Sequence, residues 1–248
     1  GAAASSRSVR RRRLRWSALP RQLVLVTAAV LVLLPAYFMV ITAFKTQEGY
    51  SLNKFAFPNP VYLGNLGAAM RGGRFLLWFG NSVVLAVGAV LLATIVSALG
   101  AFALARMEFR GRTGLLSVIT SLMVVPPVVM LVPLFLFFSR LRLTSTYTSA
   151  ILVYGGMVAP FSVYLLTSFF RTIPHPIIES ALIDGGSALD ILVRILLPLS
   201  APALTTLMVV NTLWVWNDLL VALIYVGGRP GVAPMTVTVS NLVNSLGQ

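Results

Sequence analysis

The sequence contains no cysteine, one histidine and only six acidic residues in 248. The absence of cysteine excludes disulfides and thiol chemistry. The histidine, His175, stands between Pro174 and Pro176 with no second candidate ligand nearby, so we expect no metal site. The pattern G-x-x-x-x-G-K-[ST] is also absent, which removes the common loop for cradling ATP phosphates. We therefore expect a chain that is not an enzyme and holds no cofactor of its own.

Charge of either sign is scarce as well. Charged residues make up 10% of the chain, against about 25% in soluble domains, while hydrophobic residues make up 58% and the mean hydropathy is +0.90. About 20 apolar residues span a bilayer as a helix. Five long apolar stretches lack Lys and Arg, at residues 22–44, 75–105, 115–138, 148–170 and 199–226. Alternating strands typical of outer-membrane barrels are not seen, so the sequence predicts an all-α polytopic membrane protein.

The 19 basic residues indicate an orientation in the membrane. Seven arginines precede the first span, and basic residues near span ends favour the cytoplasmic side, so we expect a cytoplasmic N-terminus. The loops then alternate, which places twelve basic residues inside and seven outside; Arg140 and Arg142 fit least well. A patch for nucleic acid or anionic lipid is another interpretation of the arginine run. We expect contact with membrane lipid and no nucleic-acid partner.

This orientation divides the chain into three parts. Residues 1–21 form a basic cytoplasmic N-terminus, and residues 22–226 form a transmembrane domain that includes a cytoplasmic loop at 171–198. Residues 227–248, with several glycines and prolines, are expected to form an irregular extracytoplasmic loop.

Half of the acidic residues lie in the loop at 171–198. Pro176 suits the first turn of a short helix, with Glu179 near its N-terminal end, where negative charge is favoured. The sequence Asp-Gly-Gly at 184–186 is expected to end this helix, because glycine adopts backbone angles that other residues avoid.

A second short helix is expected after this turn. Ser187 is a good N-cap, and Pro198 is expected to close the unit. The apolar residues of this helix are Leu189, Ile191, Leu192 and Ile195. Two such helices should lie at the cytoplasmic surface, with an apolar face either for a protein partner or for lipid headgroups. The residues alone leave both interpretations open.

The same loop resembles the EAA loop of ABC importer permeases, whose pattern is E-A-A, three residues, G, nine residues and I-x-L-P. The chain matches this spacing from Glu179 to Pro198, with Ser180 in place of the middle alanine. The resemblance implies a coupling helix that docks into a groove of a cytoplasmic ATPase. The implied coupling residues are Glu179, Ser180, Ala181, Asp184, Gly185, Ile195 and Pro198.

Two further stretches resemble the carbohydrate-type permeases, the inner-membrane subunits of maltose-type transporters. The first is "NSVVLAVGAVLLATIVSALGAFALARMEFRGR" at 81–112, in which Ala93, Ser97, Ala101 and Ala105 form a ladder that lets another helix approach closely. The second is "VVPPVVMLVPLF" at 124–135, similar to the proline-broken third span of these permeases.

The prolines of the third span, Pro126, Pro127 and Pro133, remove backbone donors and should kink or unwind it. Broken helices in transporters often mark the transport path. Pro126 and Pro127 are therefore candidate pathway residues, although a kink that serves only packing is an equal alternative.

The stretch "LWVWNDLL" at 213–220 resembles the W-N-[DE] signature of the family's fifth span. Asp218 is the only acidic residue well within a predicted span, and a carboxylate in the membrane usually faces a partner or water. We expect Asn211, Trp216, Asn217 and Asp218 to line the substrate pathway. The alternative is that Asn217 and Asp218 tie helices together while another permease supplies the substrate contacts.

The resemblance implies the type I permease fold of ABC importers, with five spans present here and a sixth expected beyond the end of the sequence. It implies four kinds of partner: a homologous second permease, two ATPase subunits that bind ATP and Mg, an extracytoplasmic substrate-binding protein and membrane lipid. The loop from residue 227 can reach this binding protein. Seventeen arginines against two lysines are typical of a GC-rich bacterial genome. The resemblance implies a location in the bacterial inner membrane.

A sugar or oligosaccharide is the expected cargo. A glycerol-3-phosphate or glycerophosphodiester permease is the alternative, which basic residues facing the pathway would favour, and the spans contain none. A membrane scaffold subunit that only anchors a partner is a further alternative, and it predicts no co-purification with an ATPase.

Overall fold

The computed structural model describes residues 19–70 and 74–246. The regular elements in this part of the chain are all helices, which confirms the predicted all-α class. Most of the predicted basic N-terminus, residues 1–18, lies outside the described residues. The chain divides into two units near residue 71, and each is considered on its own.

The first unit contains α1 (Leu19–Ala43), α2 (Gln47–Leu52) and α3 (Gly64–Met70). Helix α1 carries exposed apolar side chains along its length, as expected of a membrane span. The loop after it is fastened by Lys45, whose buried Nζ donates to Asn53 O (2.9 Å) and Lys54 O (3.0 Å). Asn65 donates to Ala43 O at 3.1 Å and to Lys45 O at 2.9 Å. These bonds join the C-terminal end of α1 to the loop that follows.

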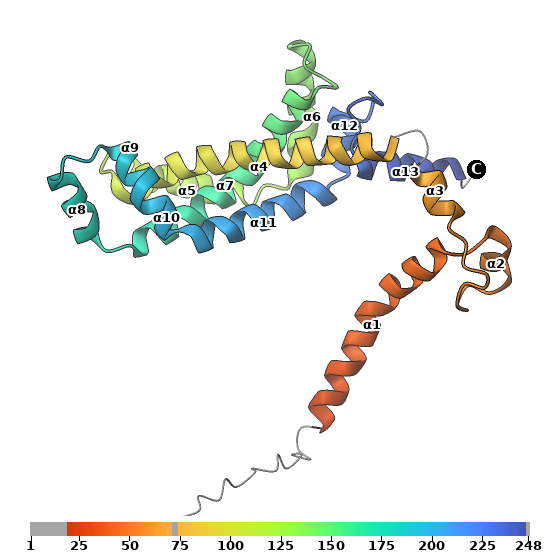
Figure 1. The fold of residues 1–248 in the computed structure, drawn as a ribbon. Helices are drawn as coiled ribbons and strands as arrows, with labels where there is room; N and C mark the ends of the chain where they lie inside the picture. The colour runs from red at the N-terminus through yellow and green to blue at the C-terminus, as the bar shows by residue number, and fades with distance from the viewer. Residues whose placement is uncertain (1–18, 71–73, 247–248) are drawn as a thin grey trace, which may run out of the picture. The chain divides into compact units, whose positions relative to one another are not determined.

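The second unit is built on three helices that run side by side (Figure 1). They are α4 (Arg74–Arg106), α7 (Tyr147–Thr172) and α11 (Ala201–Asn217). The predicted small-residue ladder lies in their contact, since Ala93, Ser97 and Ala101 are at most 1% exposed. A Cβ added to Gly155 would lie 2.9 Å from a side-chain atom of Leu92. Small residues thus let α4 and α7 approach closely, as predicted.

The predicted third span is broken. Its halves are α5 (Arg112–Leu122) and α6 (Pro127–Arg140), bent by 99°. Pro126 is the N-cap of α6, with an extended backbone, so the expected break occurs at Pro126 and Pro127. Pro133 lies inside α6, however, and the helix continues through it. The chain is therefore unwound at Pro126 and Pro127 but stays helical through Pro133, where a kink stays a prediction.

The predicted fifth span, residues 199–226, is also not one helix. Helix α11 ends at Asn217, and α12 (Leu220–Tyr225) begins after a two-residue break. The cause is Asp218, whose carboxylate accepts a hydrogen bond from Val221 N at 2.8 Å and so offers the backbone an alternative to the continuous helix. Beyond it, residues expected to be irregular form α13 (Met235–Leu246).

Among the described residues, three helices are long and apolar enough to cross a membrane. These are residues 20–43, 74–106 and 147–172. Counting each bent pair as one span raises the number to five, the number that the sequence predicts. The second bent pair consists of residues 188–199 and α11, at 79° to each other.

Candidate functional site

The loop predicted to couple to an ATPase lies at one end of the second unit, and α12 and α13 lie at the other (Figure 1). It contains α8 (His175–Ile183), α9 (Ala188–Asp190), the π-helical turn η3 (Ile191–Leu196) and α10 (Leu197–Leu199). The last three are continuous, so the loop consists of two short arms joined by a turn.

The turn after α8 forms as the sequence predicts. Asp184 is the C-cap, and Gly185 has a φ of +82°, a left-handed backbone that favours glycine. Gly185 N donates to Leu182 O at 3.0 Å and Gly186 N to Ala181 O at 2.9 Å, the pair of bonds that defines a Schellman motif. A Cβ on Gly186 would lie 2.8 Å from Ala181 O, so this position is also closed to larger residues.

The second arm begins with the predicted cap. Ser187 Oγ accepts from Asp190 N (3.2 Å), and Asp190 Oδ2 accepts from Ser187 N (3.2 Å), which makes a capping box. Arg194 Nε lies 3.3 Å from Asp190 Oδ1. Hydrogen bonds from Ser187, and then the charge of Arg194, hold the pKa of Asp190 below its ordinary value.

Two local expectations for the loop are wrong. Glu179 lies in the middle of α8 rather than near its N-terminus, because the helix already begins at His175, whose Nδ1 is 3.4 Å from Glu179 Oε1. Pro198 does not close the unit. It lies within α10, which continues η3 without a break, and the chain bends only at Ser200.

The loop has an anchored face and an exposed face. Ile178, Ile191, Leu192 and Leu196 are buried in a cluster with residues of α4, α7 and α11. Large apolar side chains are also exposed, namely Ile177, Leu182, Ile183, Leu189 and Val193. Ile183, next to the turn, is 86% exposed. The loop is thus fixed to the bundle on one side and leaves apolar surface uncovered on the other.

Most of the predicted coupling residues lie at the exposed face. Glu179, Ser180, Asp184 and Gly185 are exposed on α8 and its turn, and Ala181 is half-buried. Ile195 and Pro198 lie on the second arm, half-buried and exposed respectively. Their roles in coupling stay predictions.

At the opposite end, Asp218 connects four helices. Its Oδ2 accepts from Tyr154 OH of α7 (2.9 Å) and from Val221 N of α12 (2.8 Å). Its backbone oxygen accepts from Thr236 Oγ1 of α13 at 3.3 Å. The cavity beside it measures about 10 Å³, too small for a sugar. In this chain the geometry favours the helix-tie alternative for Asp218.

The other candidate pathway residues of α11 are engaged within the bundle in different ways. Asn211 is buried and donates to Ser162 Oγ of α7 at 2.9 Å, so it ties the two helices. Trp216 is half-buried and meets Phe79 edge-on, with ring centroids 5.5 Å apart. Asn217 is exposed, and its amide bonds to its own helix. Substrate contact by these side chains stays a prediction.

The broken third span borders a larger cavity. Pro127 and ten other residues of α5, α6, α7 and the break line a volume of about 290 Å³. All of the lining residues are apolar, including Met130, Phe138 and Pro160. Such a lining offers no hydrogen bonds from side chains to sugar hydroxyls, so this cavity alone does not make a sugar site.

Sequence reasoning missed three groups. Tyr154 and Ser162 are the partners of Asp218 and Asn211, and their only signal was polarity inside an apolar stretch. Arg106 was counted only as a loop charge, although it donates to carbonyl oxygens of Phe170 and Ile173 on the neighbouring helix. Among the described residues, no group of three or more His, Cys, Asp or Glu side chains could hold a metal.

Residues 96–245 match the family described as "Binding-protein-dependent transport system inner membrane component". The chain belongs to this family. It is 35% identical to the osmoprotective compounds uptake permease protein GgtD of Synechocystis sp., over 94% of this chain and 80% of that protein. It is 38% identical to the alpha-glucoside transport system permease protein AglG of Rhizobium meliloti over 75% of this chain. The match covers only 49% of AglG.

A solved structure confirms the fold. The permease superposes on a chain of a bacterial ABC transporter involved in the import of the acidic polysaccharide alginate, with a TM-score of 0.85. The match covers 94% of this chain and 84% of that one, at 21% identity. The family match makes the permease an inner-membrane, multi-pass transport component rather than an enzyme. An ATPase and a substrate-binding protein are the partners that an ABC importer permease implies.

Proposed function

We propose that this permease forms half of the translocation pathway of an ATP-driven importer for a sugar or oligosaccharide. A homologous second permease supplies the other half, and two ATPase subunits bind ATP and Mg on the cytoplasmic side. The loop at 171–198 docks into the ATPase, and the N-terminus is cytoplasmic.

The observation that carries the coupling role is the exposed face of the loop. Leu182, Ile183 and Leu189 lie around a glycine turn and are more than half exposed, although the same loop buries five other apolar side chains. A protein groove that covers these side chains would remove apolar surface from water, worth about 25 cal/mol per Å². Polar residues interspersed among them keep the loop too polar to enter the bilayer core.

The cargo is inferred from relatives. Three of them are named as permeases for saccharides: alpha-glucoside, diacetylchitobiose, and melibiose, raffinose and stachyose. The described spans offer no Lys or Arg inside the predicted stretches that would favour a phosphate ester. A saccharide is therefore the better supported class.

The coupling role is tested by adding bulk at the turn. We expect Gly185→Trp to insert normally but to lose ATPase co-purification and uptake of maltose, because the indole would stand in the docking surface and strain the left-handed backbone. Gly114→Trp is the matched control, since a Cβ there meets nothing within 4 Å. Wild-type uptake and ATPase retention in Gly185→Trp would reject the assignment. Glycerol-3-phosphate uptake in the same proteoliposomes tests the cargo.

A further inference from the structure

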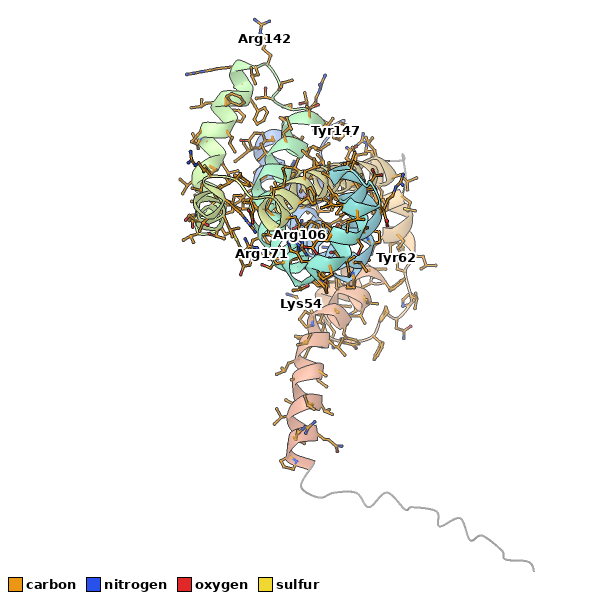
Figure 2. All side chains as sticks on the ribbon, turned by 90° about the vertical axis from the view of Figure 1, so that its left-hand side faces the viewer. Lys54, Tyr62, Arg106, Arg142, Tyr147 and Arg171 are labelled. Carbon is orange, nitrogen blue, oxygen red and sulfur yellow. The ribbon has the colours of Figure 1, made fainter. Side chains whose placement is uncertain are left out.

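Three arginines bond to the ends of α4 and α7 where the coupling loop begins; Arg106 and Arg171 join the two helices, and Arg112 of α5 bonds to the end of α4. Each donates to backbone carbonyls at a helix end. The bonds are Arg106 Nη2 to Phe170 O and to Ile173 O (2.5 Å), Arg112 Nε to Leu104 O (2.7 Å), Arg112 Nη2 to Ala105 O (3.1 Å) and Arg171 Nη2 to Leu104 O (3.3 Å). Figure 2 looks onto this end and labels Arg106 and Arg171. We call these three residues the arginine clamp.

The clamp meets a physical need of helix ends. The last four carbonyls of a helix lack partners within it, and the negative end of the helix dipole favours a cation there. Leu104 is 1% exposed and Phe170 is fully buried, so water reaches these residues poorly. The arrangement is also reciprocal, because Arg106 of α4 bonds to the end of α7 and Arg171 of α7 bonds to the end of α4.

The position of the clamp links it to the loop. Ile173, an acceptor of Arg106, precedes the first residue of α8 by two positions. Phe170 and Ile173 also belong to the buried cluster that anchors Ile178 and Leu196 of the loop. A displacement of α8 that is carried through Ile173 must therefore either move α4 together with α7 or break the bonds of Arg106.

Arg106 also has an unused donor. Its Nε is buried and bonds to no acceptor among the described residues. A buried unsatisfied donor is unfavourable, and this one leaves an N–H of Arg106 still to be satisfied.

We propose that the arginine clamp is a positioning group that transmits movement of α8 to α4 and α7. With the clamp intact, a push on the loop moves both helices as one body. Without it, the push bends the loop at Ile173 and is lost. This inference rests on the proposed docking of the loop to an ATPase.

The test uses the reconstituted complex of both permeases, the ATPase subunits and the binding protein, with maltose as the probe. We expect Arg106→Gln to keep ATPase binding while the maltose transported per ATP hydrolysed falls roughly tenfold, the scale of one charge-assisted hydrogen bond. Arg106→Lys keeps the charge but lacks the branched guanidinium group. The maltose transported per ATP should therefore fall less than in Arg106→Gln. Arg110→Gln, an exposed arginine four residues away, is the charge-matched control and should couple as wild type.

Arg171→Gln keeps the test decisive if Arg106→Gln does not fold, because Arg171 is exposed and contributes only one bond, at 3.3 Å. It should lower the same ratio by a smaller factor. Wild-type transport per ATP in folded Arg106→Gln or Arg171→Gln, with only a lower Tm, would overturn the clamp and leave the coupling loop intact. Failure of the wild-type permease to retain the ATPase would overturn the proposed function and the clamp together.

Discussion

The two ends of the second unit both place carboxylates in an apolar chain, yet they treat them differently. At the loop end, Glu179 has only an exposed contact with His175, whose side chain is 68% exposed, and large apolar residues beside it are uncovered. At the other end, Asp218 accepts hydrogen bonds from two helices through one oxygen. Asp190, also at the loop end, is bonded only within its own turn and by Arg194. Glu179 thus keeps an exposed carboxylate, whereas the carboxylate of Asp218 is used to hold helices together.

This difference has an energetic basis. A carboxylate within the membrane is stable only when its bonds are supplied by the protein or by water, and Asp218 obtains them from Tyr154 and Val221. Glu179 stands where water or a partner can supply them. The same residue chemistry thus serves cohesion at one end and, in our proposal, association at the other.

The largest effect should come from placing a charge on the coupling loop at 171–198, the exposed end of the unit. Ile183 is 86% exposed, so Ile183→Asp should leave the fold and the melting temperature of the permease unchanged. If the ATPase groove covers this side chain, burial of an unpaired carboxylate should weaken ATPase binding roughly 100-fold, as expected for a central contact. Affinity is measured by titrating the purified ATPase onto the permease in nanodiscs.

Ile183→Leu, which keeps the apolar character, is the control and should bind within about twofold of the wild type. Equal ATPase affinity for Ile183→Asp and Ile183→Leu would show that this side of the turn stays in water, and the contrast between the two ends would disappear.

A medium effect is expected at the end that holds Asp218, which we call the closed end because its carboxylate is bonded within the protein. Asp218→Ala should lower the free energy of unfolding by about 1–3 kcal/mol, because Tyr154 OH and Val221 N lose their acceptor. Asp218→Asn keeps one acceptor oxygen, so its free energy of unfolding should fall less than that of Asp218→Ala. Tyr154 and Asp218 are bonded to each other. The double variant Tyr154→Phe, Asp218→Ala should therefore lose less free energy of unfolding than the sum of the two single variants.

Thermal unfolding in detergent and maltose uptake are measured on the same variants. A stability loss with proportionate loss of assembled complex supports the helix tie. Altered maltose affinity at unchanged stability would instead return Asp218 to the substrate pathway and make the closed end a functional site as well.

The sequence predicted what depends on local chemistry. Hydropathy located the three helices that are long and apolar enough to cross a membrane. Pro176, Gly185 and Ser187 predicted the helix start, the turn and the cap of the loop, because each acts on its own backbone. The break at Asp218 was missed because it depends on a side chain that accepts a hydrogen bond from the backbone N–H three residues ahead, which hydropathy does not register. The contact with Tyr154 joins positions 64 residues apart, which no spacing rule reveals.

The arginine clamp shows a second limit. The donors are visible in the sequence, but their acceptors are backbone carbonyls, which every residue has. Only the packing of α4 against α7 shows which carbonyls lie at the two helix ends. Equally, hydropathy marks Ile183 and Ile178 alike as apolar, and only the structure separates the exposed one from the buried one.

The smallest effect should be a local response to acid at the exposed end. The Ser187 hydroxyl and N–H, and then Arg194, stabilise the charged form of Asp190 and lower its pKa below the ordinary 3.8. A lowered folded pKa means that the capping box is fully stabilising above the ordinary value and is lost as pH falls through the lowered one. We expect amide protection at Asp190 and Ile191, measured by hydrogen exchange and corrected for the intrinsic rate, to decline over that window.

Two variants separate the contributions to this response. Asp190→Asn should remove the pH dependence of protection, because no carboxylate is left to titrate. Ser187→Ala should shift it toward the ordinary pKa of aspartate, because the largest cause of the lowering is gone. The amides of Ala93 and Ala101, buried between α4 and α7, are the internal reference and should stay protected throughout. A parallel loss at both places would mean that acid unfolds the whole unit, and the capping box would then not be an independent element of the exposed end.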